Sequence, residues 1–249
     1  MRIDLNCDLG EGAGSDARIM PLVTSVNVAC GFHAGGPEAM RRTVRLARKH
    51  GVAVGAHPSY PDRAGLGRRF LAASADEVRD DVTYQIGALW AFCRAEGVRL
   101  THVKAHGALY NAAAGDVDLA RALCEAARAI DPALAVVCLA GSPMADVARE
   151  MGVPCAQEAF ADRAYTSSGT LVPRRKAGAV IDDPERVAER VSLMAREHRV
   201  VAVDGSEVPI HAATICVHGD TPGAEQIVAA IRARLAADGV EVKPFSVTD

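Results

Sequence analysis

The sequence predicts an α/β protein in which parallel strands alternate with helices. Two observations carry this prediction. Short segments with strand character recur from one end of the 249-residue chain to the other, and the stretches between them have helical periodicity with capping residues at their ends. A strand–helix rhythm of this kind implies a parallel sheet covered by helices. Periodicity alone does not choose between an open doubly wound sheet and a closed barrel.

The expected strands are short and spread along the whole chain. Each is rich in apolar residues and is bounded by glycine, proline or polar clusters. Two further segments, 200–203 and 208–210, are joined around Asp204-Gly205 and predict a hairpin. No linker or low-complexity tract divides the chain, so residues 1–249 are expected to form one domain with a small late hairpin insertion near 200–210. The predicted strands are 3–9, 23–29, 52–56, 100–104, 135–140, 153–160 and 213–217.

The helices between these strands begin and end at characteristic residues. The tetrapeptide SADE at 74–77 is a capping box, and Gly97 closes the helix that follows it. Ser142, Asp183 and Thr221 each stand directly before a proline, which is the pattern of an N-cap followed by the first helical residue. Because helices connect the strands, the strands are expected to run parallel.

Composition excludes several classes of partner. The net charge is -3 and there is no basic run, which argues against nucleic acid and against an anionic membrane surface. No apolar run is long enough to span a bilayer. Seven scattered cysteines without a C-x-x-C pair predict free thiols in a reducing compartment. Met1 leads directly into the first strand, so a cytoplasmic location is expected.

The first predicted strand is polar on one face. Asp4, Asn6 and Asp8 alternate with apolar residues and therefore point to the same side. A parallel strand that is buried on both faces reads instead as a continuous apolar run. Burying unpaired carboxylates is very costly. The polar face is therefore expected to line a wet, hydrogen-bonded cavity.

Polar residues recur with the same parity on most of the other strands, and only 135–140 lacks them. They concentrate toward the carboxyl ends, which is where active sites form in parallel β/α architectures. The sequence therefore predicts a site at that end of the sheet. The residues that share this face or follow it are Asn27, His33, His57, His102, Lys104, His106, Thr214, Cys216, His218 and Asp220.

Four of the histidines stand at or just past the carboxyl ends of four different strands, where they predict a functional cluster. His50 and His198 close predicted helices, where a cation favours the helix dipole, and are expected to be structural. His102 and His211 lie at or before the starts of strands, and neither is expected in the site. The four clustered histidines are His33, His57, His106 and His218.

No stretch matches a nucleotide phosphate loop. The GEGAG at 10–14 lacks G-x-G-x-x-G spacing, and Asp8 and Glu11 would repel a pyrophosphate, so a flexible turn is predicted. The segment TSSGTLVPRRK at 166–176 is either a phosphate site or a solvated loop. No serine or cysteine lies in a nucleophile elbow, which disfavours covalent catalysis.

Six stretches together resemble one family. They are DLNCDLGEG (4–12), NVACGFHAGGP (27–37), GAHPSYPDRAGLGRR (55–69), VKAHGALYN (103–111), EAFADRAYTSSGTLVPR (158–174) and CVHGD (216–220). They are similar to the LamB/YcsF family, which supplies the A subunits of prokaryotic ATP-dependent 5-oxoprolinases. The resemblance implies an incomplete, seven-stranded β/α barrel related to polysaccharide deacetylases. It also implies opening of 5-oxo-L-proline to L-glutamate with release of ADP and phosphate. ATP would then be a co-substrate, handled together with the partner 5-oxoprolinase subunits B and C.

Residue roles follow as hypotheses. Asp8 or Glu158 is the expected general base, tuned by partial burial. Lys104 would hold the substrate carboxylate or the phosphate, or would form an internal ion pair with Asp8. His33, His57, His106 and His218 would donate to oxyanions or move protons. The expected substrate-binding residues are Asn6, Asn27, His33, Asp162, Arg163, His218 and Asp220, with Asp162-Arg163 acting as a clamp.

Two other functions fit the same residues. A metal-dependent deacetylase or amidohydrolase would use Asp8 with two of His33, His57 and His106, because imidazole and carboxylate suit zinc. A non-catalytic protein would use the cavity only to bind the lactam and present it to its partners. Metal content separates the first alternative, and an Asp8→Asn variant that loses binding along with activity would identify the second.

Overall fold

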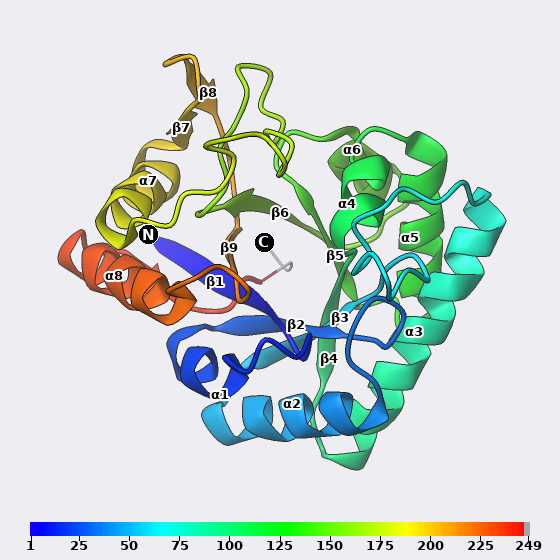
Figure 1. The fold of residues 1–249 in the computed structure, drawn as a ribbon. Coiled ribbons are helices and arrows are strands. Elements are labelled where there is room, and N and C mark those ends of the chain that lie inside the picture. The colour runs from blue at the N-terminus through cyan, green and yellow to red at the C-terminus, as the bar shows by residue number, and fades with distance from the viewer. Residues whose placement is uncertain (247–249) are drawn as a thin grey trace.

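The computed structural model describes residues 1–246, and its centre is a barrel of parallel strands (Figure 1). Neighbouring strands follow chain order, and the last barrel strand pairs with both the sixth and the first, so the sheet closes on itself. This confirms the predicted seven-stranded parallel β/α barrel and excludes the open sheet. The barrel strands are β1 (Arg2–Leu9), β2 (Ser25–Ala29), β3 (Ala53–His57), β4 (Leu100–Lys104), β5 (Ala135–Leu139), β6 (Cys155–Phe160) and β9 (Thr214–His218).

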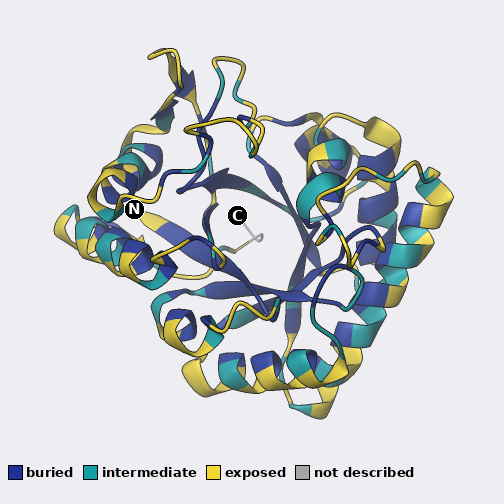
Figure 2. Cartoon of the chain, viewed as in Figure 1, coloured by how far each residue is buried: buried dark blue, intermediate teal, exposed yellow. Residues whose placement is uncertain are grey.

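Helices cover the outside of the barrel and bury their inward faces, as Figure 2 shows by colour. The predicted capping box is present, because the Ser74 hydroxyl accepts from the Glu77 N–H and the Glu77 carboxylate accepts from the Ser74 N–H. The helix after β9 starts at Ala224, later than Thr221-Pro222 predicts, because the Thr221 hydroxyl donates to Asp162 instead. The helices are α1 (Asp16–Ile19), the 3₁₀ turn η1 (Met20–Leu22), α2 (Pro37–His50), α3 (Ala75–Ala95), α4 (Gly107–Ala113), α5 (Val117–Ile130), α6 (Pro143–Glu150), α7 (Pro184–Glu197) and α8 (Ala224–Ala237).

Within the described part of the chain, three short strands lie outside the barrel. β7 (Arg199–Val201) and β8 (Glu207–Pro209) form an antiparallel hairpin at the position that the sequence indicates. β10 (Glu241–Val242) pairs in parallel with the start of β1. Within residues 1–246, no helix has the length and apolar character needed to cross a membrane.

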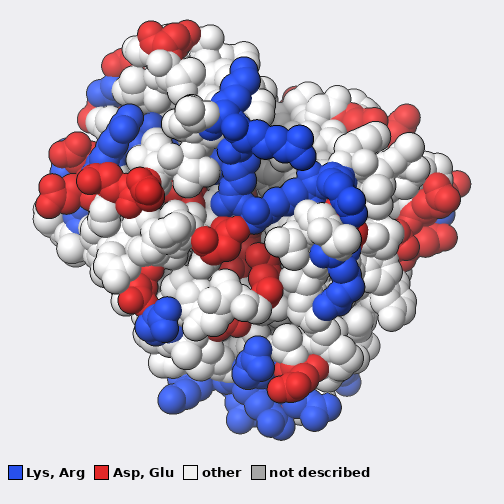
Figure 3. All heavy atoms as spheres, in the orientation of Figure 1, with Lys and Arg blue, Asp and Glu red and all other residues white. Residues whose placement is uncertain are grey.

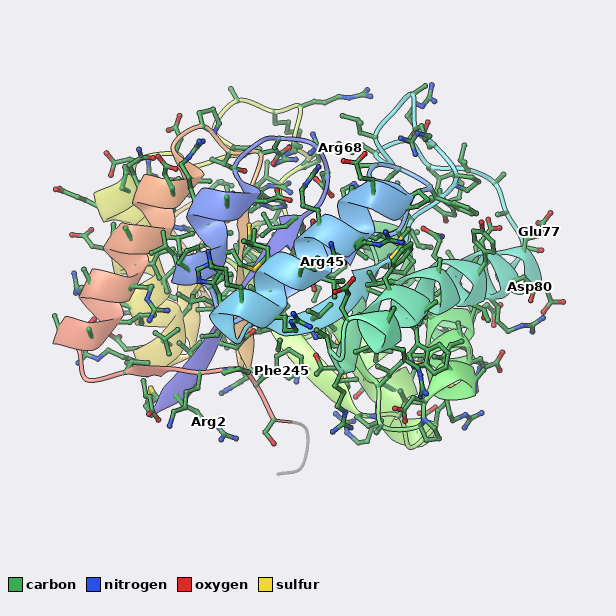
Figure 4. All side chains as sticks on the ribbon, turned by 90° about the horizontal axis from the view of Figure 1, so that it is seen from below. Arg2, Arg45, Arg68, Glu77, Asp80 and Phe245 are labelled. Carbon is green, nitrogen blue, oxygen red and sulfur yellow. The ribbon has the colours of Figure 1, made fainter. Side chains whose placement is uncertain are left out.

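The two ends of the barrel differ. The chain after β10 crosses the amino ends of the strands, and the ring of Phe245 packs edge-on against His102 with centroids 5.3 Å apart. Figure 4 shows Arg2 and Phe245 at this end and Arg68 at the opposite end. The segment around Phe245 therefore covers the amino end of the barrel, and the carboxyl ends of the strands face the loops around Arg68.

Candidate functional site

The carboxyl ends of the strands and the loops that follow them surround a cavity of about 1370 Å³. Asp8 of β1, His57 of β3 and Lys104 of β4 form part of its wall. The polar faces of these strands thus open into a cavity at the end where the sequence predicts a site. The charged and histidine side chains that line it are Asp8, Glu11, His57, Arg68, Arg69, Lys104, His106, Arg163, Arg174, Arg175, His218 and Asp220.

A buried lysine lies between two carboxylates at the base of the cavity. Lys104 Nζ is 2.9 Å from Glu158 Oε1 and 3.2 Å from Asp8 Oδ1. It also donates to Asn6 Oδ1 at 3.3 Å and to Cys216 Sγ at 3.0 Å. The internal ion pair with Asp8 is therefore present. The three N–H donors of the ammonium are engaged by protein atoms.

These charges set the protonation of the group. Burial would raise the pKa of Asp8, but His57 and Lys104 hold that pKa well below its usual range. Burial would lower the pKa of Lys104, but Asp8, Cys216 and Glu158 keep it well above its usual value. Burial raises the pKa of Glu158, and the attraction of Lys104 only partly offsets this. Asp8 is thus the firmly ionised member of the two carboxylates.

Three histidines and one glutamate converge beside Asp8. His33 Nε2 lies 2.9 Å from Glu11 Oε1, and His106 Nδ1 lies 2.9 Å from His57 Nε2. Burial lowers the pKa of His33 and that of His106 to about 3, so both rings are neutral. Burial also opposes protonation of His57, but the Asp8 charge outweighs it and raises the pKa of His57. The ligand atoms of Glu11, His33, His57 and His106 lie within 4.8 Å of one another, so this group can hold a metal ion.

Glycines with positive φ bring the loops to these positions. Gly10 (φ +77°) and Gly12 (φ +90°) flank Glu11, and such angles strain any residue with a Cβ. Gly67 (φ +65°) lies against the cluster, where an added Cβ would be 2.7 Å from Cδ2 of His106. The turn after β1 and the loop after β3 can therefore close onto the histidines only with glycine at these points.

Below the cavity, the polar face forms a sealed hydrogen-bond network. Asn27 Nδ2 donates to Asn6 Oδ1 and to Asp8 Oδ1, each at 2.8 Å. Asn6 Nδ2 donates in turn to Glu158 Oε1 at 2.8 Å. His102 Nε2 lies 2.9 Å from Asn27 Oδ1 and must donate to it, because that amide oxygen is an acceptor only. The expected wet cavity is therefore confined to the upper end of the barrel.

Asp4 ends this network at the floor of the barrel. Its carboxylate accepts from Thr24 at 2.6 Å and from Ser25 at 2.7 Å, and also from Thr214. Burial raises the pKa of Asp4 to about 6 despite these bonds. Asp4 therefore contributes to the closed end of the barrel and does not reach the cavity.

Arginines surround the mouth of the cavity. In Figure 3 a blue band of Lys and Arg curves around a hollow in this face, with acidic side chains along one side. Arg68 and Arg174 both pair with Asp220, the latter at 3.1 Å. Arg163 is buried, and its Nη2 donates to the Val172 carbonyl at 2.7 Å. The rim thus presents positive charge to whatever enters.

Asp162 holds a histidine of the cavity wall in place. Its carboxylate accepts from His218 Nδ1 at 2.8 Å, from the His218 N–H at 3.2 Å and from the Thr221 hydroxyl at 2.7 Å. Asp162 is fully buried, whereas His218 lines the cavity. The side chains of Asp162 and Arg163 therefore face different surroundings and do not form a clamp of two adjacent groups.

The sequence-predicted residues gather at one end of the barrel but at different depths. Of these residues, the ones that line the cavity are Asp8, His57, Lys104, His106, Arg163, His218 and Asp220. Buried behind the cavity wall are Asn6, Asn27, Glu158 and Asp162. The ring of His33 stacks on that of His106, with centroids 3.9 Å apart. Sequence reasoning missed Glu11, His102 and Arg68, and it included Arg174 only as part of the possible phosphate segment 166–176. The signal for Glu11 was an acid between two glycines directly after a polar strand, and that for His102 was its shared parity with Lys104.

Fold and cavity together define the class: a parallel β/α barrel with a cavity at the carboxyl ends of its strands. Within that class, the chain belongs to the LamB/YcsF family, whose model matches residues 3–249. A Pyrococcus furiosus protein named as the A subunit of 5-oxoprolinase is 53% identical over 250 residues, which cover 98% of each chain. A Rhodopseudomonas palustris protein of the same name is 50% identical over 100% of both chains.

Solved structures agree with this fold. The crystal structure of a lactam utilization protein from Thermus thermophilus has a TM-score of 0.92 and 49% identity, covering 98% of this chain and 100% of that one. A CE4-family pseudoenzyme from Bacillus anthracis has a TM-score of 0.50 at 11% identity, covering 97% of this chain and 63% of that one. The second likeness concerns the fold alone, and it agrees with the predicted deacetylase-like barrel.

Proposed function

We propose that this chain is the hydrolytic A subunit of a 5-oxoprolinase, which opens the lactam ring of 5-oxo-L-proline to give L-glutamate. The observation that supports it most is the sequence identity of 50–53% with relatives that carry this name, over nearly the whole length of both chains. In the overall reaction one water adds to the lactam carbonyl carbon and the ring C–N bond breaks. ATP is hydrolysed to ADP and phosphate at the cost of a second water.

The substrate carboxylate, or a phosphorylated lactam, binds at the arginine rim. Lys104 is less suited to this role, because its ammonium is already engaged by Asp8, Glu158 and Asn6. Arg68 and Arg174 line the cavity and are restrained by one shared carboxylate, which keeps two guanidinium groups side by side.

Asp8 receives the proton from the attacking water. It lines the cavity, whereas Glu158 is fully buried behind the wall. Asp8 Oδ1 is occupied by Lys104 and Asn27, and Oδ2 lies 3.4 Å from His57 Nε2 on the cavity side. The low pKa of Asp8 keeps its carboxylate ionised at neutral pH, so that it accepts a hydrogen bond from the water. The same low pKa makes Asp8 a weak base, so it takes the proton only as the water oxygen bonds to the lactam carbon and becomes more acidic. Glu158 and Lys104 are then positioning residues.

Activation by ATP takes place together with partner subunits B and C. The sequence contains no phosphate loop, and the arginine rim suits a phosphorylated ligand. Phosphorylation of the lactam oxygen would make the ring carbon electrophilic and would supply a leaving group.

The test is glutamate release from 5-oxoproline and ATP, by this chain alone and with both partners added. We expect glutamate only in the full mixture. Its absence from every mixture, with partners verified as active, would overturn the proposal. In the full mixture, Asp8→Asn should lose turnover while equilibrium binding of 5-oxoproline persists. Parallel loss of binding and turnover would favour a lactam-binding protein without a catalytic role.

A further inference from the structure

The geometry points to a specific site for a divalent transition-metal ion, held by Glu11, His33, His57 and His106. The four side chains come from four separate segments: the turn after β1, the loop after β2, the end of β3 and the segment that follows β4. Three of the residues are buried and Glu11 is only partly exposed, so the site faces the cavity and not bulk water. This set differs from the sequence prediction, which chose Asp8 and overlooked Glu11.

Backbone contacts fix which ring nitrogens carry hydrogens. His57 Nδ1 lies 2.8 Å from the Lys104 carbonyl oxygen, and His106 Nε2 lies 2.9 Å from the Leu66 carbonyl oxygen. A carbonyl only accepts, so both of these nitrogens are N–H donors. His106 Nδ1 therefore carries a lone pair, and it faces His57 Nε2 at 2.9 Å.

These two nitrogens need a positive charge between or beside them, which either a proton on His57 Nε2 or a metal ion can supply. Glu11 Oε1, another acceptor, lies 3.3 Å from His106 Nδ1 and 3.8 Å from His57 Nε2. It also lies 2.9 Å from His33 Nε2. In a tetrahedral zinc site with bonds of about 2.0–2.1 Å, neighbouring ligand atoms are about 3.3 Å apart. The distances given above between ligand atoms of the four residues run from 2.9 to 3.8 Å and so lie on both sides of that value.

The donor chemistry selects the class of ion. Three imidazoles and one carboxylate suit Zn²⁺, Co²⁺ or a related transition metal, whereas Mg²⁺ and Ca²⁺ prefer all-oxygen sites. The carbonyls behind His57 and His106 are the outer contacts that orient metal-binding imidazoles. A bound ion would supply a Lewis acid on the cavity wall beside Asp8. Binding of the ion does not depend on the reaction proposed above, so the two can be tested separately.

The experiment uses untagged full-length protein, freed of metal by a chelator and titrated calorimetrically with Zn²⁺ and Co²⁺. We expect one ion per chain and intense visible Co²⁺ bands of a four-coordinate site. Glu11→Gln and His33→Ala should each weaken binding by at least about 100-fold. His211→Ala is the matched control, because His211 pairs with His198 elsewhere, with ring centroids 4.8 Å apart. It should bind as the wild type does.

Several outcomes would overturn the site. These are the absence of a 1:1 site in the wild type, unchanged affinity in Glu11→Gln and His33→Ala, or loss of binding in His211→Ala. Thermal unfolding in chelator shows whether the variants fold, and added Zn²⁺ should raise the Tm of the wild type and the control only. Glutamate release by a chain that takes up no metal in the titration would refute this site and leave the proposed function standing. Binding of one metal ion per chain without glutamate release from the full mixture would support this site and overturn the proposed function.

Discussion

Replacing Gly55 by alanine tests whether the barrel interior depends on one missing side chain. A Cβ at this position on β3 would lie 2.1 Å from Nε2 and 2.2 Å from Cδ2 of His102. No contact between real atoms is that short, so the imidazole must leave its place in the network. Overpacking of this kind costs about 1–3 kcal/mol. Displacing the ring also removes the donor to the buried oxygen of Asn27, which costs a further 1–3 kcal/mol or so.

Urea unfolding of Gly55→Ala should therefore show a loss of roughly 2–6 kcal/mol against the wild type. Gly87→Ala is the matched control, because Gly87 lies within α3 and an added Cβ meets nothing within 4 Å. It should stabilise the chain by about 0.5–1 kcal/mol through helix propensity. In a His102→Ala background, alanine at 55 should cost far less. A loss below about 0.5 kcal/mol, or an equal loss in both backgrounds, would refute the reasoning.

Three further predictions concern the charged groups. Lys104→Met leaves Glu158 and Asp8 without their cation and should lower the free energy of urea unfolding by about 3–5 kcal/mol. The double variant Lys104→Met/Glu158→Gln should recover part of that loss. A single variant as stable as the wild type would contradict the ion pair. Burial raises the pKa of Asp4 to about 6, which is above the pKa of the same carboxyl in the unfolded chain. The wild type therefore loses stability as the pH rises from the unfolded-state pKa of Asp4 through 6. Asp4→Asn lacks this loss, and unfolding free energies should move in its favour by about 2.4 kcal/mol between pH 4 and 7, whereas a constant difference would refute the shift. Arg174→Ala should raise KM for 5-oxoproline several-fold and leave Tm nearly unchanged, because its pair with Asp220 is partly solvated; an unchanged KM would remove it from the site.

Strand parity predicts the main features of the fold and of the site. The period-two alternation of Asp4, Asn6 and Asp8 places all three inside the barrel, because a strand has only two faces. Lys104 also alternates with apolar neighbours, so its side chain lies inside the barrel with Asn6 and Asp8 for the same reason. Closure of the sheet does not follow from parity, because it depends on how far each strand tilts and shifts against the next. Only the pairing of β9 with both β6 and β1 decides it.

Position along a strand proves a poorer guide than parity. His102 is set aside in sequence reasoning because it lies near the amino end of its strand, yet its ring is fully inside the network with Asn27. The polar interior runs the whole length of the barrel, so even the closed end needs hydrogen-bonding side chains. Glu11 escapes detection for a different reason. It follows the strand, and the positive φ values of Gly10 and Gly12 turn it back toward the histidines, which alternation cannot predict.

The sealed network explains why the polar interior extends so far below the cavity. The interior of a parallel barrel is usually filled with branched apolar side chains, which pack well but impose no orientation on a charge. Here Asn27 ties Asp8 to Asn6, and Asn6 ties both to Glu158. Each amide uses donor and acceptor at once, so turning one of them would leave a buried polar atom unpaired. The carboxylate of Asp8 is thereby held with one oxygen bound to the network and the other directed toward His57. The proton-accepting role proposed for Asp8 gains from such support, because the orientation of its carboxylate is set before any ligand enters.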